Sequence, residues 1–274
     1  MTGGRGRFDG KVAFVTGAGR GQGRSHALAL AAEGADLALL DLGDSGRVSD
    51  PPYPTASASQ LADTAEAARR LGSRVETFEV DVRDPDGLVE AADTAARRLG
   101  GLDLVVANAG ITDGFHRTWE IPVSHWRTMI DVNLSGVFYT VRAAVPHLLP
   151  RRDGALVLVS SGVGIRAVPG LSHYVAAKTA LRGLSVSLAA ELGPYGIRCN
   201  TVHPGGVDTE MTTAMIRFND VPRDELLAGF RARQFIEADI GTADVTAAVL
   251  WLLSPEARYV TGLEMTVDAG ESRK

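Results

Sequence analysis

Short apolar runs alternate along the chain with longer segments whose apolar residues recur at helical spacing. The apolar runs predict strands near residues 12–16, 36–41, 74–80, 103–107, 155–160, 197–203 and 264–267. The segments between them predict helices over residues 24–33, 58–71, 85–99, 123–149, 172–192 and 242–253. Strands that alternate with helices are typical of a parallel sheet covered on both faces. We therefore expect an α/β fold, with one Rossmann-type domain over residues 1–274 and a doubly wound parallel sheet of about seven strands.

Two segments interrupt this alternation. Residues 42–59 form a long insertion between the second strand and its helix, and they contain several prolines. These prolines and Tyr53 favour a packed loop over a disordered surface insertion, which is the alternative. Residues 209–240 mix methionines and phenylalanines with charged residues. Beside an α/β site, such a segment favours a lid or a pocket wall that covers the substrate.

The composition narrows the classes of partner and location. The chain has 274 residues, of which 45% are hydrophobic and 22% charged, which suits one large globular domain. Its net charge is −5 without a basic tract, so we expect neither nucleic acid nor a membrane surface as a partner. Residues 1–7 lack the apolar core of a signal peptide, and we expect a cytoplasmic protein. Cys199 is the single cysteine, which excludes an intrachain disulfide and favours a buried structural residue.

A glycine-rich turn joins the first predicted strand to the first predicted helix. The turn runs Gly17-Ala-Gly-Arg20-Gly21-Gln22-Gly23 and leads into an Ala/Leu-rich segment. Glycines let the backbone approach phosphate groups, and a helix N-terminus offers free N–H groups and the positive end of its dipole. The turn therefore predicts a site for the pyrophosphate of a dinucleotide.

The second predicted strand ends in Asp41. A carboxylate at this place can accept a hydrogen bond from the adenosine ribose 2′-hydroxyl and repels a 2′-phosphate, which favours NAD over NADP. Arg20 and Arg47 could each contact a phosphate, so NADP stays open on this reasoning. A solvated carboxylate at the end of a strand is the structural alternative.

Tyr174 and Lys178 lie one turn apart on a predicted helix and so share a face. Lys11, Lys178 and Lys274 are the only lysines in a chain rich in arginine. An ammonium beside a phenol lowers the pKa of that phenol. We expect Lys178 to act in this way and to make Tyr174 an acid/base usable near neutral pH.

These motifs occur in an order that resembles the short-chain dehydrogenase/reductase family from about Phe8 to Gly270. The resemblance assigns cofactor binding to Gly17, Arg20, Gly21, Gln22, Gly23, Asp41, Leu42, Asp81, Val82, Asn108, Ala109, Gly110, Tyr174, Lys178, Pro204, Gly205, Val207 and Thr209. It assigns catalysis to Asn133, Ser161, Tyr174 and Lys178. It also implies a homotetramer that pairs the helices predicted over residues 123–149 and 172–192, with a second interface through residues 264–267.

The resemblance implies hydride transfer between a carbinol carbon and the nicotinamide of NAD. Tyr174 takes or gives the hydroxyl proton, Lys178 stabilises the phenolate and contacts the nicotinamide ribose, and Ser161 orients the substrate oxygen. Asn133 supports a water chain that carries protons away from Lys178. The alternative is that these residues have structural roles only. Ser161 would then be a capping hydroxyl, and Asn133 would be a buried amide bonded to the backbone.

A narrower resemblance rests on the insertion. Asp41 followed by Pro52-Tyr53-Pro54-Thr55-Ala56, together with the turn continuing as Arg20-Gly-Gln-Gly-Arg-Ser-His26, is similar to the mycofactocin-coupled, carveol-dehydrogenase-like subfamily. This similarity implies NAD that is held too tightly to exchange and that is reoxidised by mycofactocin as an external acceptor. Because the prolines are stiff, we expect residues 42–59 to help retain the cofactor.

The substrate expected from the sequence is a small hydrophobic secondary alcohol or its ketone. The apolar residues that we expect to line its pocket are Phe115, Trp119, Val168, Leu171, Met211 and Met215. The six histidines are dispersed along the sequence, and we predict no metal site. His116 could lie at the pocket mouth or in a solvated loop. An NADPH-dependent 3-oxoacyl-carrier-protein reductase and a non-catalytic dinucleotide-binding regulator are the other functions considered.

Overall fold

A computed structural model describes residues 6–44 and 48–274 of the chain. Within these residues, one seven-stranded sheet has the order β5-β2-β1-β6-β7-β8-β9, and every pair in it is parallel. The strands are β1 (Val12–Thr16), β2 (Asp36–Asp41), β5 (Val75–Glu79), β6 (Leu104–Ala107), β7 (Gly154–Val159), β8 (Ile197–Pro204) and β9 (Glu264–Val267). The predicted α/β fold and its strands are therefore confirmed, with bounds that differ by a residue or so.

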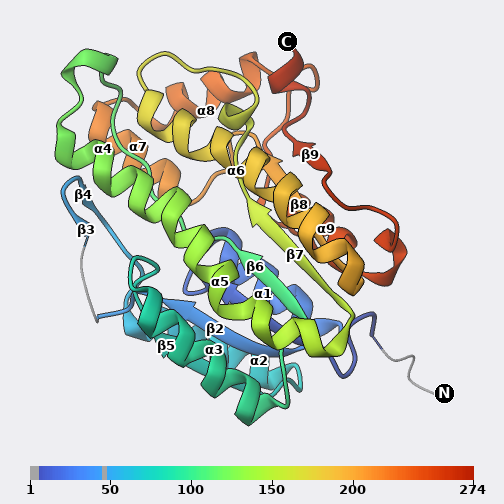
Figure 1. Cartoon of the computed structure of the whole chain (residues 1–274). Helices are drawn as coiled ribbons and strands as arrows, with labels where there is room; N and C mark the ends of the chain where they lie inside the picture. The colour runs from blue at the N-terminus through green and yellow to red at the C-terminus, as the bar shows by residue number, and fades with distance from the viewer. Residues whose placement is uncertain (1–5, 45–47) are drawn as a thin grey trace.

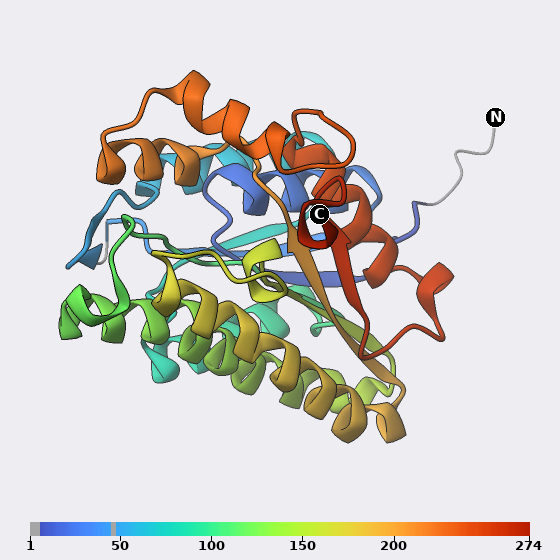
Figure 2. The same cartoon turned by 90° about the horizontal axis from the view of Figure 1, so that it is seen from above.

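Helices cover both faces of the sheet, as Figures 1 and 2 show. One face carries α1 (Gly21–Ala32), α2 (Ala58–Arg70) and α9 (Thr242–Leu253), which share one apolar core with the sheet. The other face carries α3 (Pro85–Leu99), α5 (Gly136–Leu148) and α6 (Ser172–Leu192), which share a second core. Both faces of the inner strands β1, β2, β6, β7 and β8 are buried, which explains why most of these strands read as apolar runs. The edge strands β5 and β9 are only partly buried.

The helix predicted over residues 123–149 is interrupted. It comprises α4 (Val123–Ile130), a π-helical turn over Asp131–Ser135, and α5. A π-turn inside a helix is rare and is frequent at functional sites. Here the turn contains Asn133, which is fully buried.

The two irregular segments both have ordered structure where they are described. Val48–Ser49 (β3) pairs antiparallel with Pro52–Tyr53 (β4) to form a small ribbon. The segment after Thr209 forms α7 (Glu210–Asn219) and α8 (Arg223–Ala232). Leu42, Val48 and Tyr53 pack in a third apolar cluster, so the part of the insertion that is described is packed, as the prolines predicted.

The sheet places a crevice where a ligand is expected. The chain proceeds outward from β1 through β2 to β5 and then returns to the other side of β1 at β6, so the strand order reverses between β1 and β6. In open α/β sheets, ligands bind outside the carboxyl ends of the strands at such a reversal. No helix formed by residues 6–44 and 48–274 is both long and apolar enough to span a bilayer.

Candidate active site

The glycine turn after β1 fits a bound dinucleotide because side chains are excluded from it. Gly17 has φ +68°, in the region that favours glycine, and a Cβ on it would lie 2.8 Å from the side-chain nitrogen of Asn108. A Cβ on Gly23 would lie 1.9 Å from the carbonyl oxygen of Gly17. The amide of Asn108 donates to the carbonyls of Thr16 and Gly17, at 3.0 and 3.2 Å, and so braces the turn. The backbone is therefore held open for a close approach by phosphate.

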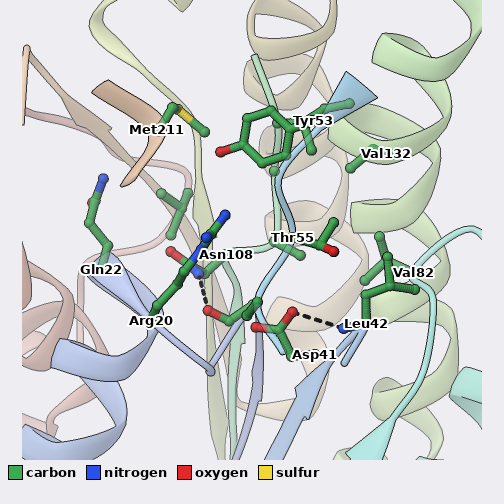
Figure 3. A pocket seen from close by; sticks show the side chains of 18 of the residues that line it. Arg20, Gln22, Asp41, Leu42, Tyr53, Thr55, Val82, Asn108, Val132 and Met211 are labelled. Atoms are coloured by element: carbon green, nitrogen blue, oxygen red, sulfur yellow. Dashed lines mark hydrogen bonds between the residues drawn. The ribbon is translucent and has the colours of Figure 1, made fainter. Parts of the chain in front are cut away.

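The N-terminus of α1 faces the groove that this turn borders. Arg20 is the N-cap residue of α1, and its side chain does not cap the helix. The N–H groups of the first turn can therefore bind an anion. The predicted cofactor residues that line the groove are Gly17, Arg20, Gly21, Gln22, Gly23, Asp41, Leu42, Asp81, Val82, Asn108, Ala109, Gly110, Tyr174, Lys178 and Thr209. Figure 3 shows Arg20 on one side of this groove, Leu42 and Val82 on the opposite side, and Asp41 between them.

The carboxylate of Asp41 is fixed by the backbone. One oxygen accepts from the N–H of Gly19 and the other from the N–H of Leu42, both at 2.8 Å. Burial raises the pKa of Asp41, while the two backbone bonds and the charge of Arg20 oppose this rise. Arg20 itself donates to the carbonyl of Pro54 in the insertion. Arg47, the other candidate phosphate partner, lies outside the described residues.

The insertion contributes residues to the groove that were not among those assigned to cofactor binding from the sequence. Val48, Tyr53, Thr55 and Ala56 all line it. Figure 3 shows the Tyr53 ring and Thr55 beside the same space as Arg20. Burial raises the pKa of Tyr53 to about 12, so its phenol is protonated at neutral pH. The prolines and Tyr53 indicate that this segment is packed. A sequence pattern does not show which side chains of a two-residue strand point toward the groove.

Tyr174 and Lys178 project from α6 and are both buried. The ammonium of Lys178 lies 5.8 Å from the centre of the Tyr174 ring and donates to the carbonyl of Val159 at 2.9 Å. Burial lowers the pKa of Lys178 to about 8. Burial also raises the pKa of Tyr174 to about 12, a rise that the Ser161 hydroxyl opposes and Tyr53 increases. In this structure the pKa of Tyr174 thus shifts opposite to the predicted direction, because desolvation outweighs its polar neighbours.

Asn133 and Gly110 lie beside the Lys178 ammonium. A Cβ on Gly110 would be 2.8 Å from the side-chain oxygen of Asn133 and 3.4 Å from Nζ of Lys178. The same oxygen of Asn133 accepts from the N–H of Ile111 at 3.1 Å, and its amide nitrogen donates to the carbonyl of Met129. The π-turn therefore brings Asn133 close to Lys178 and fixes its orientation.

An apolar cavity of about 310 Å³ adjoins the groove. Its wall includes the predicted residues Phe115, Val168, Leu171, Met211 and Met215, together with Ser161, Leu226 and Phe230. Trp119 was predicted for this wall and is not part of it, because its side chain projects from a short 3₁₀ turn and is 79% exposed. His116 also lies outside the wall. Pro204, Gly205 and Val207 line this cavity rather than the groove.

The groove and the cavity meet at a shared wall. The residues that line both are Gln22, Ser160, Tyr174, Thr209 and Met211. The Tyr174 hydroxyl comes within 4.0 Å of the Met211 sulfur, which belongs to α7. A ligand in the groove and a ligand in the cavity would therefore both contact Tyr174.

Comparison with known proteins agrees with this geometry. A family model described as enoyl-(acyl carrier protein) reductase matches residues 17–272. The chain is 41% identical to (−)-trans-carveol dehydrogenase of Rhodococcus erythropolis, over 98% of this chain and 99% of that protein. It is 37% identical to 3-alpha-(or 20-beta)-hydroxysteroid dehydrogenase of Mycobacterium bovis, over 97% of this chain and 90% of that protein. The crystal structure of carveol dehydrogenase from Mycobacterium avium in complex with NAD superposes with a TM-score of 0.93 and 41% identity, covering 98% of this chain and 100% of the other.

The chain belongs to the short-chain dehydrogenase/reductase family. It is an NAD-dependent oxidoreductase of that family, similar to the carveol and hydroxysteroid dehydrogenases. The resemblance to carveol-dehydrogenase-like proteins that the insertion indicated is confirmed.

Proposed function

We propose that the protein interconverts a small hydrophobic secondary alcohol and its ketone, with the carbinol carbon in the apolar cavity and NAD in the groove. The observation that carries this proposal is the position of Tyr174, which lines both spaces. Most of the exposed wall of the cavity is apolar, which suits the hydrocarbon body of an alcohol, and hydroxyls such as Ser161 and Thr112 also line it. The charged residues in the wall are Arg166, Arg233 and Glu271, and Glu271 pairs with both arginines.

The placement of the chain's own residues supports the roles that we propose for them. NAD, when bound, supplies the hydride acceptor or donor. Tyr174 removes the hydroxyl proton in oxidation or donates it in reduction, and Ser161 orients the substrate oxygen by hydrogen bonding. Lys178 supplies positive charge that favours the phenolate and holds the nicotinamide ribose. Asn133 holds the water chain through which Lys178 exchanges protons with solvent.

We propose that Asp41 selects NAD. Each of its oxygens is held by one backbone N–H and keeps a lone pair for a ribose hydroxyl. A 2′-phosphate there would meet a fixed negative charge. The guanidinium of Arg20 is engaged by Pro54. These contacts favour NAD over the NADPH of a 3-oxoacyl-carrier-protein reductase.

We also propose that the insertion slows cofactor exchange and that mycofactocin is the external electron acceptor. Three contacts support the first part, namely the bond from Arg20 to Pro54, the burial of Tyr53 and the packing of Val48. A segment that is packed beforehand covers a ligand at little ordering cost and mainly slows its release. A dehydrogenase whose NADH stays bound must pass its electrons to an acceptor that comes to it.

A homotetramer is the assembly that we propose. Phe138 on α5 and Val186 on α6 are 47% and 52% exposed in the single chain, and these are the helices that the family pairs. Light scattering at micromolar concentration should give four times the chain mass. A monomer would contradict the proposal.

One experiment tests reaction, cofactor and exchange together. Purified protein is desalted and then denatured, and the released cofactor is identified by mass spectrometry. A panel of secondary alcohols is assayed with free NAD alone and with an artificial acceptor dye. We expect NAD or NADH in the released fraction and faster turnover with the dye. Full activity on free NAD with rapid exchange of labelled NAD would overturn the trapping. No turnover of any secondary alcohol or ketone in either assay would overturn the reaction.

A further inference from the structure

The structure gathers three of the dispersed histidines around one buried carboxylate. Asp113 is 2% exposed, and its Oδ2 lies 2.7 Å from Nδ1 of His125. The same oxygen lies 3.3 Å from Nε2 of His116 and 3.3 Å from Nε2 of His173. The ligand atoms of Asp113, His116 and His125 all lie within 4.8 Å of one another. Sequence spacing could not predict this cluster, because its members come from the loop after β6, from α4 and from α6.

A fifth side chain orients the cluster from outside. Asp50, in the turn of the β3–β4 ribbon, has its Oδ1 2.7 Å from Nε2 of His125. His125 is thus held between two carboxylates, with Nε2 toward Asp50 and Nδ1 toward Asp113. Metal-binding histidines commonly donate the second ring N–H to a carboxylate in this manner, which fixes the nitrogen that faces the ion.

Hydrogen bonding within the chain leaves the cluster incompletely satisfied. The Oδ1 of Asp113 accepts from the N–H of Gly114 at 2.7 Å, so Oδ2 alone faces the imidazoles. Nε2 of His116 is buried and makes no hydrogen bond to any residue in 6–44 or 48–274. Three ring nitrogens converge on one oxygen that has two lone pairs. Buried polar atoms without partners are rare and call for a specific explanation.

The distances suit a metal ion. Nitrogen and oxygen ligands lie about 2.0–2.2 Å from zinc, so two ligand atoms in a tetrahedral site lie about 3.4 Å apart. The contact of His116 with Asp113, at 3.3 Å, already has this separation. The contact of His125 with Asp113 must lengthen by about 0.7 Å, since an ion would replace that hydrogen bond. Imidazole and carboxylate together are ligands of the zinc class rather than of Mg²⁺ or Ca²⁺.

We propose that Asp113, His116 and His125 bind one divalent transition-metal ion of the zinc class and that a water completes its coordination. Asp50 orients His125, and His173 holds the Asp113 carboxylate from the other side. The site is separate from the hydride chemistry, because none of these residues lines the groove or the cavity. Its position links three parts of the active site. Asp113 lies between Thr112 and Phe115, which line the cavity, and His173 precedes Tyr174 on α6. Asp50 connects the insertion to the same cluster through His125. A bound ion would fasten these segments together.

The test is metal binding by the full-length protein, purified without a histidine tag. Zn²⁺ affinity is measured by competition with a chromophoric chelator, and Co²⁺ is added separately to record its visible spectrum. We expect one Zn²⁺ per chain and the intense visible bands of four-coordinate Co²⁺. His116→Gln removes a ligand that makes no hydrogen bond, so the variant should fold, and its Zn²⁺ affinity should fall at least 100-fold. Asp50→Asn should lower affinity about tenfold, as an outer-shell change does.

His147→Gln is the matched control. His147 pairs with Asp93, with Nε2 2.9 Å from Oδ1, and does not belong to the group of candidate ligands around Asp113. Wild type and this control should bind Zn²⁺ equally and should both unfold at a higher temperature when Zn²⁺ is present. His116→Gln should show no such rise. Equal Zn²⁺ affinity in wild type and His116→Gln would overturn the proposal, and so would Co²⁺ spectra that show only weak octahedral bands in both proteins.

Discussion

The groove and the cavity that meet at Tyr174 are built from different material. The groove is bounded by strand ends and glycines, and a Cβ at Gly17 or Gly23 would strike backbone or a braced side chain. The cavity is walled mostly by side chains, several of them from α7 and α8, which pack on the outside of the fold. A wall of backbone accepts one shape of ligand, whereas a wall of methionine and phenylalanine side chains changes with every substitution. This difference indicates that the groove is specific for one cofactor, whereas the substrate specificity of the cavity can change with its side chains.

A substitution in the wall shared by the groove and the cavity should reduce turnover more than a change in either one alone. Tyr174→Phe removes only the hydroxyl, so folding and NAD binding should persist while turnover falls by about 10²–10⁴, the usual contribution of general acid–base catalysis. Turnover of the purified variant with its best alcohol measures the effect. Tyr259→Phe is the control, since Tyr259 is 88% exposed and should keep full turnover. Near-normal turnover in Tyr174→Phe would remove this residue from the chemistry.

The groove should lose most of its affinity for NAD when the backbone of its glycine turn is displaced. Gly23→Ala places a Cβ 1.9 Å from the Gly17 carbonyl oxygen, which forces the turn apart. We expect NAD affinity, measured by calorimetry on protein freed of cofactor, to fall by about two orders of magnitude because the turn can no longer accept the pyrophosphate. Gly193→Ala is the matched control, since an added Cβ there meets nothing within 4 Å and φ is −53°. Unchanged affinity in Gly23→Ala would show that phosphate does not bind at this turn.

The buried acid/base pair should make oxidation depend on pH and leave reduction nearly flat. Burial raises the pKa of Tyr174 to about 12, so near pH 7 the phenol is protonated and ready to donate in ketone reduction. Oxidation needs the phenolate, whose fraction grows about tenfold from pH 7 to 8. Above pH 8 the slope should decrease, because Lys178, with a pKa of about 8, loses the charge that favours the phenolate. Rates measured at saturating cofactor in both directions check this, and an oxidation rate independent of pH from 6 to 8 would contradict it.

The same contrast explains what the sequence could predict. Strands and the glycine turn depend on local composition, and the strand bounds were predicted to within a residue or so. Most residues assigned to the cofactor line the groove, but Pro204, Gly205 and Val207 line the cavity instead. The roles of Tyr174, Ser161 and Asn133 rest on a motif order, and their chemistry stays a prediction. The direction of the Tyr174 pKa depends on burial, which sequence spacing does not give. Trp119 and the histidines around Asp113 show the same limit, because the loop after β6 carries no pattern that fixes which side chains point inward.

The smallest effect should come from trimming the cavity alone. Met215→Ala removes a side chain from its wall, and each lost buried methylene contact costs about 0.8 kcal/mol, a factor of roughly four in affinity. The KM for a small alcohol should therefore rise a few-fold, with kcat nearly unchanged, because the lost contacts bind ground and transition states alike. An alcohol longer by one or two methylenes should recover part of the loss by filling the space. Met215→Leu conserves volume and should keep the wild-type KM. NAD affinity serves as the second readout, since Met215 does not line the groove. If NAD affinity fell as much as the KM rose, the groove and the cavity would be one adjustable site, and the proposed division between a fixed cofactor and an adjustable substrate would be wrong.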